Sequence, residues 1–365
     1  NIQHPEDKED KKVFKNVEKE INELIRQSKF EYALSQIEKE LKSDKIEDKY
    51  KSSLLLKKAQ IYSSIGNPDA SEKDWKNWRW QFQNRVTSLK KLAEITEILM
   101  PRQEKLHRVL CTYPMAITPY FLSLIEPDDE NHPLTLQCIP DEKEVSVSPH
   151  CSDDPLNEDD SMPVPRLIRR YPDRVLAMVT RSCATNCRHC NRKRFWDKKD
   201  PSTLKNRLDK MVRYVADSPE IREVIISGGD PLTYDDHHLE MILSSFAAIP
   251  HLEVLRIGSR VPVVMPMRIT KELCRMLKRY RPLWFNTQFN HPSEITPDAG
   301  RACNMLQEAG IPVSNQSVLL KGVNDNEDTM RRLLYGLQKI SVRPYYLFHC
   351  DPVKGCYHLR TEMTE

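Results

Sequence analysis

Three cysteines stand close together at residues 183, 187 and 190, with the spacing CxxxCxxC. Three thiolates in one loop can bind three irons of an iron-sulfur cluster, and a fourth iron is then left without a protein ligand. An open coordination position of this kind is what a catalytic metal centre needs. Cys183, Cys187 and Cys190 therefore predict a catalytic [4Fe-4S] cluster.

Two other uses of these cysteines stay open. Structural zinc takes four Cys or His ligands and often binds paired CxxC motifs. His189 lies between Cys187 and Cys190, where it is poorly placed to be the fourth ligand. The other possibility is that the three thiols bind nothing. The remaining cysteines are scattered, and we expect most of them to be packing residues: Cys111, Cys138, Cys151, Cys274, Cys303, Cys350 and Cys356.

Six short β-branched runs alternate with amphipathic helical segments from Tyr171 onward. The runs predict strands at 175–180, 223–227, 253–257, 283–289, 313–319 and 343–349, separated by helices such as 204–216 and 270–279. Repeated strand-helix units imply parallel strands joined by right-handed crossovers. We therefore expect an α/β fold, a partial (β/α)6 barrel over residues 166–365.

Barrels of this class carry their functional groups at the carboxyl ends of the strands. The polar and glycine residues at these predicted ends are Cys183, Ser227, Gly228, Gly229, Asp230, Ser259, Arg260, Asn290, His291 and Asp351. Gln316 lies within the fifth strand, where it could face inward. The sequence therefore predicts one composite site.

Residues 1–165 precede the barrel and are expected to form two regions. Residues 1–68 have helical periodicity, and the stretch 30–66 resembles a tetratricopeptide hairpin, so this extension is either a helical cap or a partner-docking module. In the second region, residues 69–165, the tryptophans at 75, 78 and 80 predict a helix with a core-facing stripe. The acidic, proline-rich stretch 127–165 is interpreted as a solvated surface loop.

Composition and charge argue against a nucleic-acid-binding or membrane-spanning protein. The formal net charge is +3, with 56 basic and 53 acidic residues, so no bulk basic surface for nucleic acid is expected. No apolar run approaches the roughly 20 residues that cross a bilayer, and the N-terminus is not signal-like. Clustered cysteines in a chain of this size indicate a reducing compartment. We expect a cytoplasmic protein that binds neither nucleic acid nor membrane.

The cysteine motif resembles that of the radical S-adenosylmethionine superfamily, whose signature has an aromatic or hydrophobic residue before the last cysteine. His189 fills that position. In the superfamily the open iron holds S-adenosyl-L-methionine, which is cleaved reductively to a 5′-deoxyadenosyl radical. The resemblance implies that Ser227, Gly228, Gly229 and Asp230 bind this cofactor, because GGD resembles the superfamily's glycine-rich motif. Gln316 is expected in the same pocket.

Several longer segments resemble the lysine 2,3-aminomutase family, from about Trp75 to the end of the chain. They span residues 169–174, 183–195, 289–292, 315–320 and 343–346. The resemblance implies an isomerase, an intramolecular aminotransferase that uses pyridoxal 5′-phosphate together with the cluster and S-adenosyl-L-methionine. Its reaction would move the amino group of an amino acid from C2 to C3.

The resemblance also implies roles for single residues. Tyr171 and Arg174 would hold the pyridoxal phosphate group, and Arg192 would clamp the substrate carboxylate with a bidentate fork. Lysine-acting members carry an aspartate at the position of Asp351, whereas glutamate-acting members carry a lysine. Asp351 therefore points to conversion of L-lysine to β-lysine. Alternatives are an enzyme for arginine or glutamate, a radical enzyme without aminomutase activity, and a non-catalytic scaffold.

The chain departs from the family pattern at several points. The pyridoxal lysine would lie beyond Asp351, and no match for it occurs before Glu365, so we expect a chain truncated at its C-terminus. Gln288 stands where relatives commonly have histidine. Asn326 replaces a cysteine of an intersubunit zinc site, so no zinc is expected there. The family pattern further implies a homo-oligomer and a reductant such as flavodoxin or ferredoxin.

Overall fold

The computed structural model describes residues 72–93, 103–125, 131–146, 148–196 and 202–362, together with short helical stretches at 16–17, 19–21, 36–37 and 39–40. The predicted tetratricopeptide-like hairpin lies almost entirely outside the described residues and stays a prediction. Across the described part of the chain, no helix is long and apolar enough to cross a membrane.

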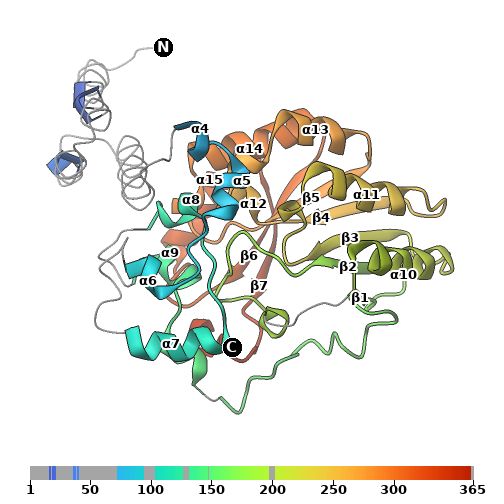
Figure 1. Ribbon diagram of the computed structural model, residues 1–365, viewed down its shortest axis with the longest axis horizontal. Coiled ribbons are helices and arrows are strands. Elements are labelled where there is room, and N and C mark those ends of the chain that lie inside the picture. The colour runs from blue at the N-terminus through green and yellow to red at the C-terminus, as the bar shows by residue number, and fades with distance from the viewer. Residues whose placement is uncertain are drawn as a thin grey trace.

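Seven strands form one sheet in the order β1 to β7 (Figure 1). The strands are β1 (Leu167–Ile168), β2 (Arg174–Thr180), β3 (Glu223–Gly228), β4 (Val254–Gly258), β5 (Leu283–Thr287), β6 (Val313–Leu319) and β7 (Arg343–His349). β1 pairs antiparallel with β2, and every later pair of neighbours is parallel. The six predicted parallel strands and the partial (β/α)6 barrel are confirmed, whereas β1 was not predicted.

Five helices connect the parallel strands and cover the outer face of the sheet (Figure 1). They are α10 (Leu204–Ala216), α11 (Asp236–Ala247), α13 (Lys271–Lys278), α14 (Pro297–Glu308) and α15 (Glu327–Lys339). Each begins at a capping side chain that accepts a backbone N–H bond: Thr203, Asp235, Thr270, Thr296 and Asn326. The predicted helices at 204–216 and 270–279 are confirmed, and Asn326 begins α15.

Short helices elaborate the loops that follow the carboxyl ends of the strands. They are η3 (Lys193–Phe195), η4 (Pro231–Thr233), α12 (Val261–Val264), η5 (Pro266–Arg268), η6 (Pro292–Glu294) and η7 (Tyr357–Leu359). The loops that contain these short helices are far apart in the sequence but gather at the carboxyl end of the barrel. The composite site is expected at that end.

The described residues between 72 and 146, here called the accessory region, form seven short helical elements. They are α4 (Glu72–Trp75), α5 (Trp78–Gln83), α6 (Leu89–Ala93), α7 (Gln103–Thr112), α8 (Pro119–Leu122), α9 (Pro133–Cys138) and η2 (Glu142–Val145). The single tryptophan helix predicted near residue 75 is wrong, because Asn77 interrupts it and caps α5 by accepting a 2.9 Å bond from Arg79 N. The core-facing interpretation is confirmed: Trp75 is buried, and its ring centroid lies 6.3 Å from that of Trp80.

The prediction of one solvated loop over 127–165 is wrong for residues 131–146. Proline begins α9 at its first turn, and Asp141 begins η2 with a capping box completed by Glu144. Both residue types were read as loop formers, although they also start helices. Gln137 and Glu144 are buried here.

One hydrophobic core joins the accessory region to the barrel, since Tyr120 and Phe121 belong to the same buried cluster as Ile226 and Phe285. A smaller core lies under the last turns and contains Cys350 and Cys356. The scattered cysteines mostly serve packing as expected: Cys138, Cys274, Cys303, Cys350 and Cys356 are buried, Cys151 is half-buried and Cys111 is exposed.

Candidate active site

A cavity of about 490 Å³ opens at the carboxyl ends of β2 to β7. The predicted site residues that line it are Cys183, Cys187, Cys190, Arg192, Ser227, Gly228, Gly229, Asp230, Ser259, Arg260, Gln316 and Asp351. The fold therefore brings most of the predicted composite site together. Tyr171, Arg174, Asn290 and His291 do not line this cavity.

The three cysteines lie in the loop 181–196, here called the cluster loop, and none of them forms a disulfide. Within the described residues, no three Cys, His, Asp or Glu side chains converge on one metal ion. Zinc needs its ligands around a single point, whereas each thiolate of an iron-sulfur cluster binds a different iron. Three thiols in one loop fit the chemistry of such a cluster.

Burial controls the protonation of these thiols. It raises the pKa of Cys190 to about 11 and that of Cys183 well above its ordinary value, with the neighbouring thiols adding to the effect. Both groups are therefore neutral thiols before metal binds. Bound iron would reverse this balance, because the positive charge of a metal deprotonates a coordinating thiol.

The accessory region fixes the backbone of the cluster loop. The Arg85 guanidinium donates to the carbonyl oxygen of Cys183, and Asn186 N donates to Ala116 O at 2.8 Å. Further along the loop, Arg188 N donates to Gln137 O at 2.8 Å. The loop thus takes its shape from segments outside the barrel.

A buried ion cluster, the loop anchor, holds the cluster loop from its other side. Arg188 is fully buried, and its Nε and Nη2 donate to the Glu144 carboxylate at 2.8 and 2.6 Å. Lys193 Nζ donates to the same carboxylate and to Gly355 O, each at 2.7 Å. Burial alone would raise the pKa of Glu144, but the two cations hold that pKa below its ordinary value.

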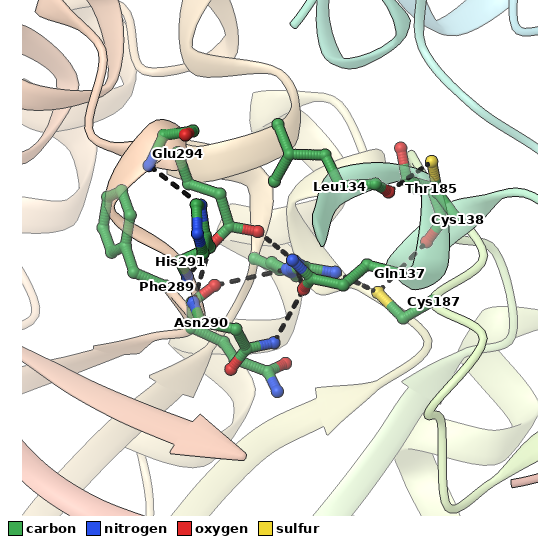
Figure 2. A network of polar contacts seen from close by, with 12 residues as sticks. Leu134, Gln137, Cys138, Thr185, Cys187, Phe289, Asn290, His291 and Glu294 are labelled. Atoms are coloured by element: carbon green, nitrogen blue, oxygen red, sulfur yellow. Dashed lines mark hydrogen bonds and ion pairs between the residues drawn. The ribbon is translucent and has the colours of Figure 1, made fainter. Parts of the chain in front are cut away.

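A second buried network reaches Cys187 directly (Figure 2). Arg260 Nη1 donates to Cys187 Sγ at 2.7 Å, and its Nη2 donates to Gln137 Oε1 at 2.6 Å and to Glu294 Oε1 at 2.7 Å. Figure 2 shows Gln137, on α9, between Cys187 and the pair formed by Asn290 and Glu294. Asn290 Nδ2 donates to Gln137 Oε1 at 2.9 Å, so Asn290 supports the site from behind.

His291 also lies behind the cavity, contrary to expectation. Its ring caps η6 by accepting a 3.2 Å bond from Ser293 N. Burial lowers the pKa of His291 to about 4, so the ring is neutral near pH 7. Its position directly after β5 was not sufficient to turn it into the cavity.

His189 contributes an unpaired donor to the cavity wall. Its Nε2 accepts from Gln288 Nε2 at 3.3 Å and Asn290 Nδ2 at 3.4 Å, which leaves the ring proton on Nδ1. Among the described residues, the buried Nδ1 has no partner. Burial lowers the pKa of His189 well below its ordinary value, so the ring is neutral. A polar ligand in the cavity would satisfy this donor.

The glycine motif packs against the start of the cluster loop. Gly228 has φ +124°, and a Cβ there would lie 2.5 Å from Thr180 O. A Cβ on Gly229 would collide with the carbonyl of Ser182. Only glycine at both positions allows this approach of β3 to the cysteine-bearing segment.

Asp230 ties the ends of two strands together. Its carboxylate accepts from Ser259 Oγ at 2.7 Å and from Arg260 N at 2.8 Å, and burial raises its pKa to about 6. Ser227 and Gln316 line the cavity, and the Gln316 side chain makes no hydrogen bond to a described residue. Gln316 is therefore available to a ligand.

Arg192 and Asp351 line the same cavity and carry opposite charges. Arg192 pairs with Glu158, whose oxygen accepts from Nη2 at 2.7 Å, and Asp351 Oδ2 accepts from Asn191 Nδ2 at 3.0 Å. The prediction that the acidic stretch is solvated is wrong for Glu158, which is 3% exposed. The Glu158 carboxylate forms ion pairs with two arginines of the cluster loop, Arg192 and Arg194, and these pairs stabilise its buried position.

Tyr171 and Arg174 lie at the other end of β2, with the Arg174 guanidinium 5.2 Å from the centroid of the Tyr171 ring. Arg174 shares the cavity-lining face of β2 with Met178, because residues four apart on a strand face the same side. On β7, the rings of Tyr346 and Phe348 stack at 5.3 Å and are exposed. Arg174 and the rings of Tyr346 and Phe348 thus lie on β2 and β7, two strands whose carboxyl ends border the cavity.

Comparison with known proteins agrees with this geometry. Residues 178–334 match the Radical SAM superfamily. The chain is 46% identical over 298 residues to L-lysine 2,3-aminomutase of Fusobacterium nucleatum, covering 82% of this chain and 70% of that protein. It is 47% identical over 297 residues to the Clostridium subterminale enzyme of that name (81% and 71% covered). Glutamate 2,3-aminomutase of Clostridioides difficile is 41% identical over 309 residues (85% and 72% covered).

This chain belongs to the lysine 2,3-aminomutase family. Members of the lysine 2,3-aminomutase family are radical S-adenosylmethionine isomerases that move an amino group from C2 to C3. They use a [4Fe-4S] cluster, S-adenosyl-L-methionine and pyridoxal 5′-phosphate. The three cysteines and the orphaned His189 donor fit the first two groups. The exposed rings of Tyr346 and Phe348 suit the flat pyridine of the third, although no lysine lines the cavity among the described residues.

Sequence reasoning missed several residues that shape this aminomutase site. Gln137 and Glu144 lay in a stretch read as loop, and Glu158 was read as solvated. Arg260 was noted at a strand end but was given no role. The basic run Arg192 to Arg194 was the signal that could have predicted the buried carboxylates. Three cations next to a predicted buried cluster need carboxylate partners nearby.

Proposed function

We propose that this aminomutase acts on L-lysine and forms β-lysine. The supporting observation is that Arg192 and Asp351, which carry opposite charges, line the same cavity. A guanidinium suits the α-carboxylate of an amino acid, and a carboxylate suits a cationic side chain. A glutamate side chain would place its negative charge against Asp351, which disfavours that alternative.

The proposed roles follow from the positions of the residues. Cys183, Cys187 and Cys190 would hold the cluster, while Ser227, Gly228, Gly229, Asp230 and Gln316 would contact S-adenosyl-L-methionine. Tyr171 and Arg174 would hold the pyridoxal phosphate group. When bound, S-adenosyl-L-methionine and the cluster would supply a carbon radical, and pyridoxal 5′-phosphate would supply the carbonyl group that holds the migrating nitrogen.

The chain's own contribution is orientation and exclusion of water. Arg192 and Asp351 would hold the two charged ends of lysine and so fix C2 and C3 relative to the cluster loop. Leu156, Phe195, Trp196, Val264 and Val318 form an apolar part of the cavity wall. Such a wall keeps water away from a reactive carbon centre.

Family membership implies a small-molecule substrate and an electron donor. We propose flavodoxin or ferredoxin as the donor and a homo-oligomer as the assembly. Reduction of the purified enzyme by either protein, followed as S-adenosyl-L-methionine cleavage, would identify the donor. Light scattering would measure the molar mass of the protein in solution and so the number of subunits in the homo-oligomer.

The decisive experiment is anaerobic reconstitution of the protein with iron and sulfide, followed by turnover of L-lysine, L-arginine and L-glutamate in the presence of S-adenosyl-L-methionine, pyridoxal 5′-phosphate and a reductant. We expect a brown protein that releases β-lysine. S-adenosyl-L-methionine cleavage without any β-amino acid would instead indicate a radical enzyme that lacks aminomutase activity.

The Cys187→Ala variant is the matched control for the scaffold alternative. It should keep its circular dichroism spectrum and lose iron and turnover together, because one thiolate ligand is missing. Unchanged function in a variant without iron would favour the scaffold.

A further inference from the structure

Glu158 and Arg192 form an asymmetric ion pair at the cavity wall. Arg192 Nε donates to both Glu158 oxygens at 3.2 Å, and Nη2 donates to Oε1 at 2.7 Å. The Glu158 side chain is 4% exposed, and that of Arg192 is 18% exposed. Glu158 therefore occupies one edge of the guanidinium, the edge formed by Nε and Nη2.

The adjacent edge of the Arg192 guanidinium, formed by Nη1 and the second N–H of Nη2, stays available. A guanidinium carries five N–H donors, and a carboxylate engages two of them side by side. Nη1 of Arg192 makes no hydrogen bond to any residue that the structure describes, and Arg192 lines the cavity. One arginine can thus hold Glu158 by one edge and a second carboxylate by the Nη1 and Nη2 edge.

Glu158 is itself held firmly. Its Oε2 accepts from Arg194 Nη2 at 2.9 Å, so it lies between two guanidinium groups that would otherwise repel each other. The loop that carries it is tied to the turn after Asp351, because Ser152 N donates to Pro352 O and Lys354 N donates to Ser152 O, each at 3.0 Å. The support of Arg192 is thus built into the fold.

We infer that Glu158 is a positioning residue for substrate binding: it fixes the Arg192 guanidinium so that its free edge meets the substrate α-carboxylate. The inference rests on the proposed binding of that carboxylate by Arg192. A charged side chain with several rotatable bonds loses less freedom on binding when one edge is already fixed.

A different role for Glu158 predicts the opposite result. In this alternative, the Glu158 carboxylate occupies the place of the substrate carboxylate and must leave Arg192 before the substrate can bind. Neutralising Glu158 would then strengthen substrate binding. The direction of the change in KM therefore separates positioning from competition.

The test compares Glu158→Gln and Glu158→Asp with the wild type and with Asp153→Asn. Asp153 is on the same loop, and its ion pair with Lys354 at 2.6 Å is exposed. Each reconstituted protein is assayed for kcat and KM with L-lysine. Affinities of the unreduced proteins for L-lysine and for L-lysinamide, which lacks the carboxylate, are measured by equilibrium dialysis.

For Glu158→Gln we expect KM for L-lysine to rise about tenfold while kcat changes by less than about threefold. The affinity for L-lysinamide should be unchanged, Glu158→Asp should restore part of the loss, and Asp153→Asn should behave as the wild type. Iron content and thermal stability verify that each variant is folded.

Three results would overturn the inference: a lower KM, no change, or equal loss of affinity for the acid and the amide. Failure of the proposed substrate is distinguishable, because it would appear in the wild type as turnover of another amino acid. The comparison of acid with amide would then be made on that amino acid and would still test Glu158.

Discussion

The proposal that the substrate is L-lysine depends on the negative charge of Asp351. It lines the cavity and keeps one oxygen bonded to Asn191, which leaves the other for a ligand. Charged hydrogen bonds of this kind contribute roughly 1.5–3 kcal/mol. In the proposed function, the preference for lysine over an acidic amino acid rests on this carboxylate.

We predict that Asp351→Asn lowers kcat/KM for L-lysine by about 10- to 100-fold, because the amide keeps the shape and the Asn191 contact but loses the charge. Steady-state assays with L-lysine measure the loss, and Asp153→Asn is again the control. An unchanged kcat/KM would show that Asp351 does not contact the substrate side chain.

Gly229 offers a steric test of the motif after β3. A Cβ at this position would meet the Ser182 carbonyl and the backbone of Arg181, neither of which can yield easily. We predict that Gly229→Ala lowers stability by about 1–3 kcal/mol and reduces iron uptake. Differential scanning calorimetry and iron analysis measure both effects.

Gly300 is the matched control for that substitution. A Cβ on Gly300, within α14, would lie 3.1 Å from Ile340 Cγ2, a side-chain atom that can shift. Alanine also favours the helix over glycine. Gly300→Ala should therefore keep wild-type stability and iron content, and equal damage by both variants would contradict a special role for Gly229.

Single residues also show where prediction from sequence reaches its limit. The three cysteines and the GGD motif could be recognised because their spacing is local. Glu158 could not, because its burial depends on Arg192, which lies 34 positions away. The neighbours of Arg260 come from α9, the cluster loop and η6, and no local pattern specifies such a convergence.

At the scale of elements, η2 and the cluster loop are joined by the loop anchor. Glu144 is paired with two buried cations, and removal of one partner from a buried pair costs about 3–5 kcal/mol. We predict that Glu144→Gln loses about this much stability at pH 7. Urea unfolding monitored by circular dichroism measures the difference.

The same pair predicts how that difference depends on pH. The pKa of Glu144 in the folded protein lies below its ordinary value of 4.5, so the ionised form stabilises the fold above pH 4.5. The advantage is lost as the pH falls through the folded pKa, because Glu144 then becomes neutral like glutamine. The stability difference between wild type and Glu144→Gln should therefore shrink below pH 4.5.

Glu142→Gln is the control for both measurements. Glu142 is also in η2, but its 2.9 Å pair with Lys105 is exposed, and exposed pairs contribute at most about 1 kcal/mol. Its substitution should have little effect at any pH. Similar losses in both variants would assign the effect to η2 rather than to the buried pair.

The parallel strands were predictable because each is a run of five or more residues that carries β-branched or aromatic side chains between turn formers. β1 has only two residues, too few for any alternation to show. α9 and η2 were missed because Pro133 and Asp141 begin helices as readily as they form turns.

At the scale of the whole molecule, the accessory region and the barrel share one core and both shape the cluster loop. We therefore predict that a chain beginning at residue 69 takes up iron, whereas one beginning at residue 166 does not. The shorter chain lacks Arg85, Ala116 and Glu144. Iron and sulfide analysis after anaerobic reconstitution distinguishes the two, and equal iron in both would contradict the prediction.

The contacts that shape the cysteine loop also bear on the order of events during synthesis. Arg85 lies 98 positions before Cys183, and Gly355 lies 162 positions after Lys193. A nascent chain therefore cannot arrange its three thiols until nearly all of residues 85–355 has left the ribosome. We therefore expect iron to bind to the folded apoprotein: protein made without iron should become active when iron is supplied while translation is blocked, and lasting inactivity would contradict this order.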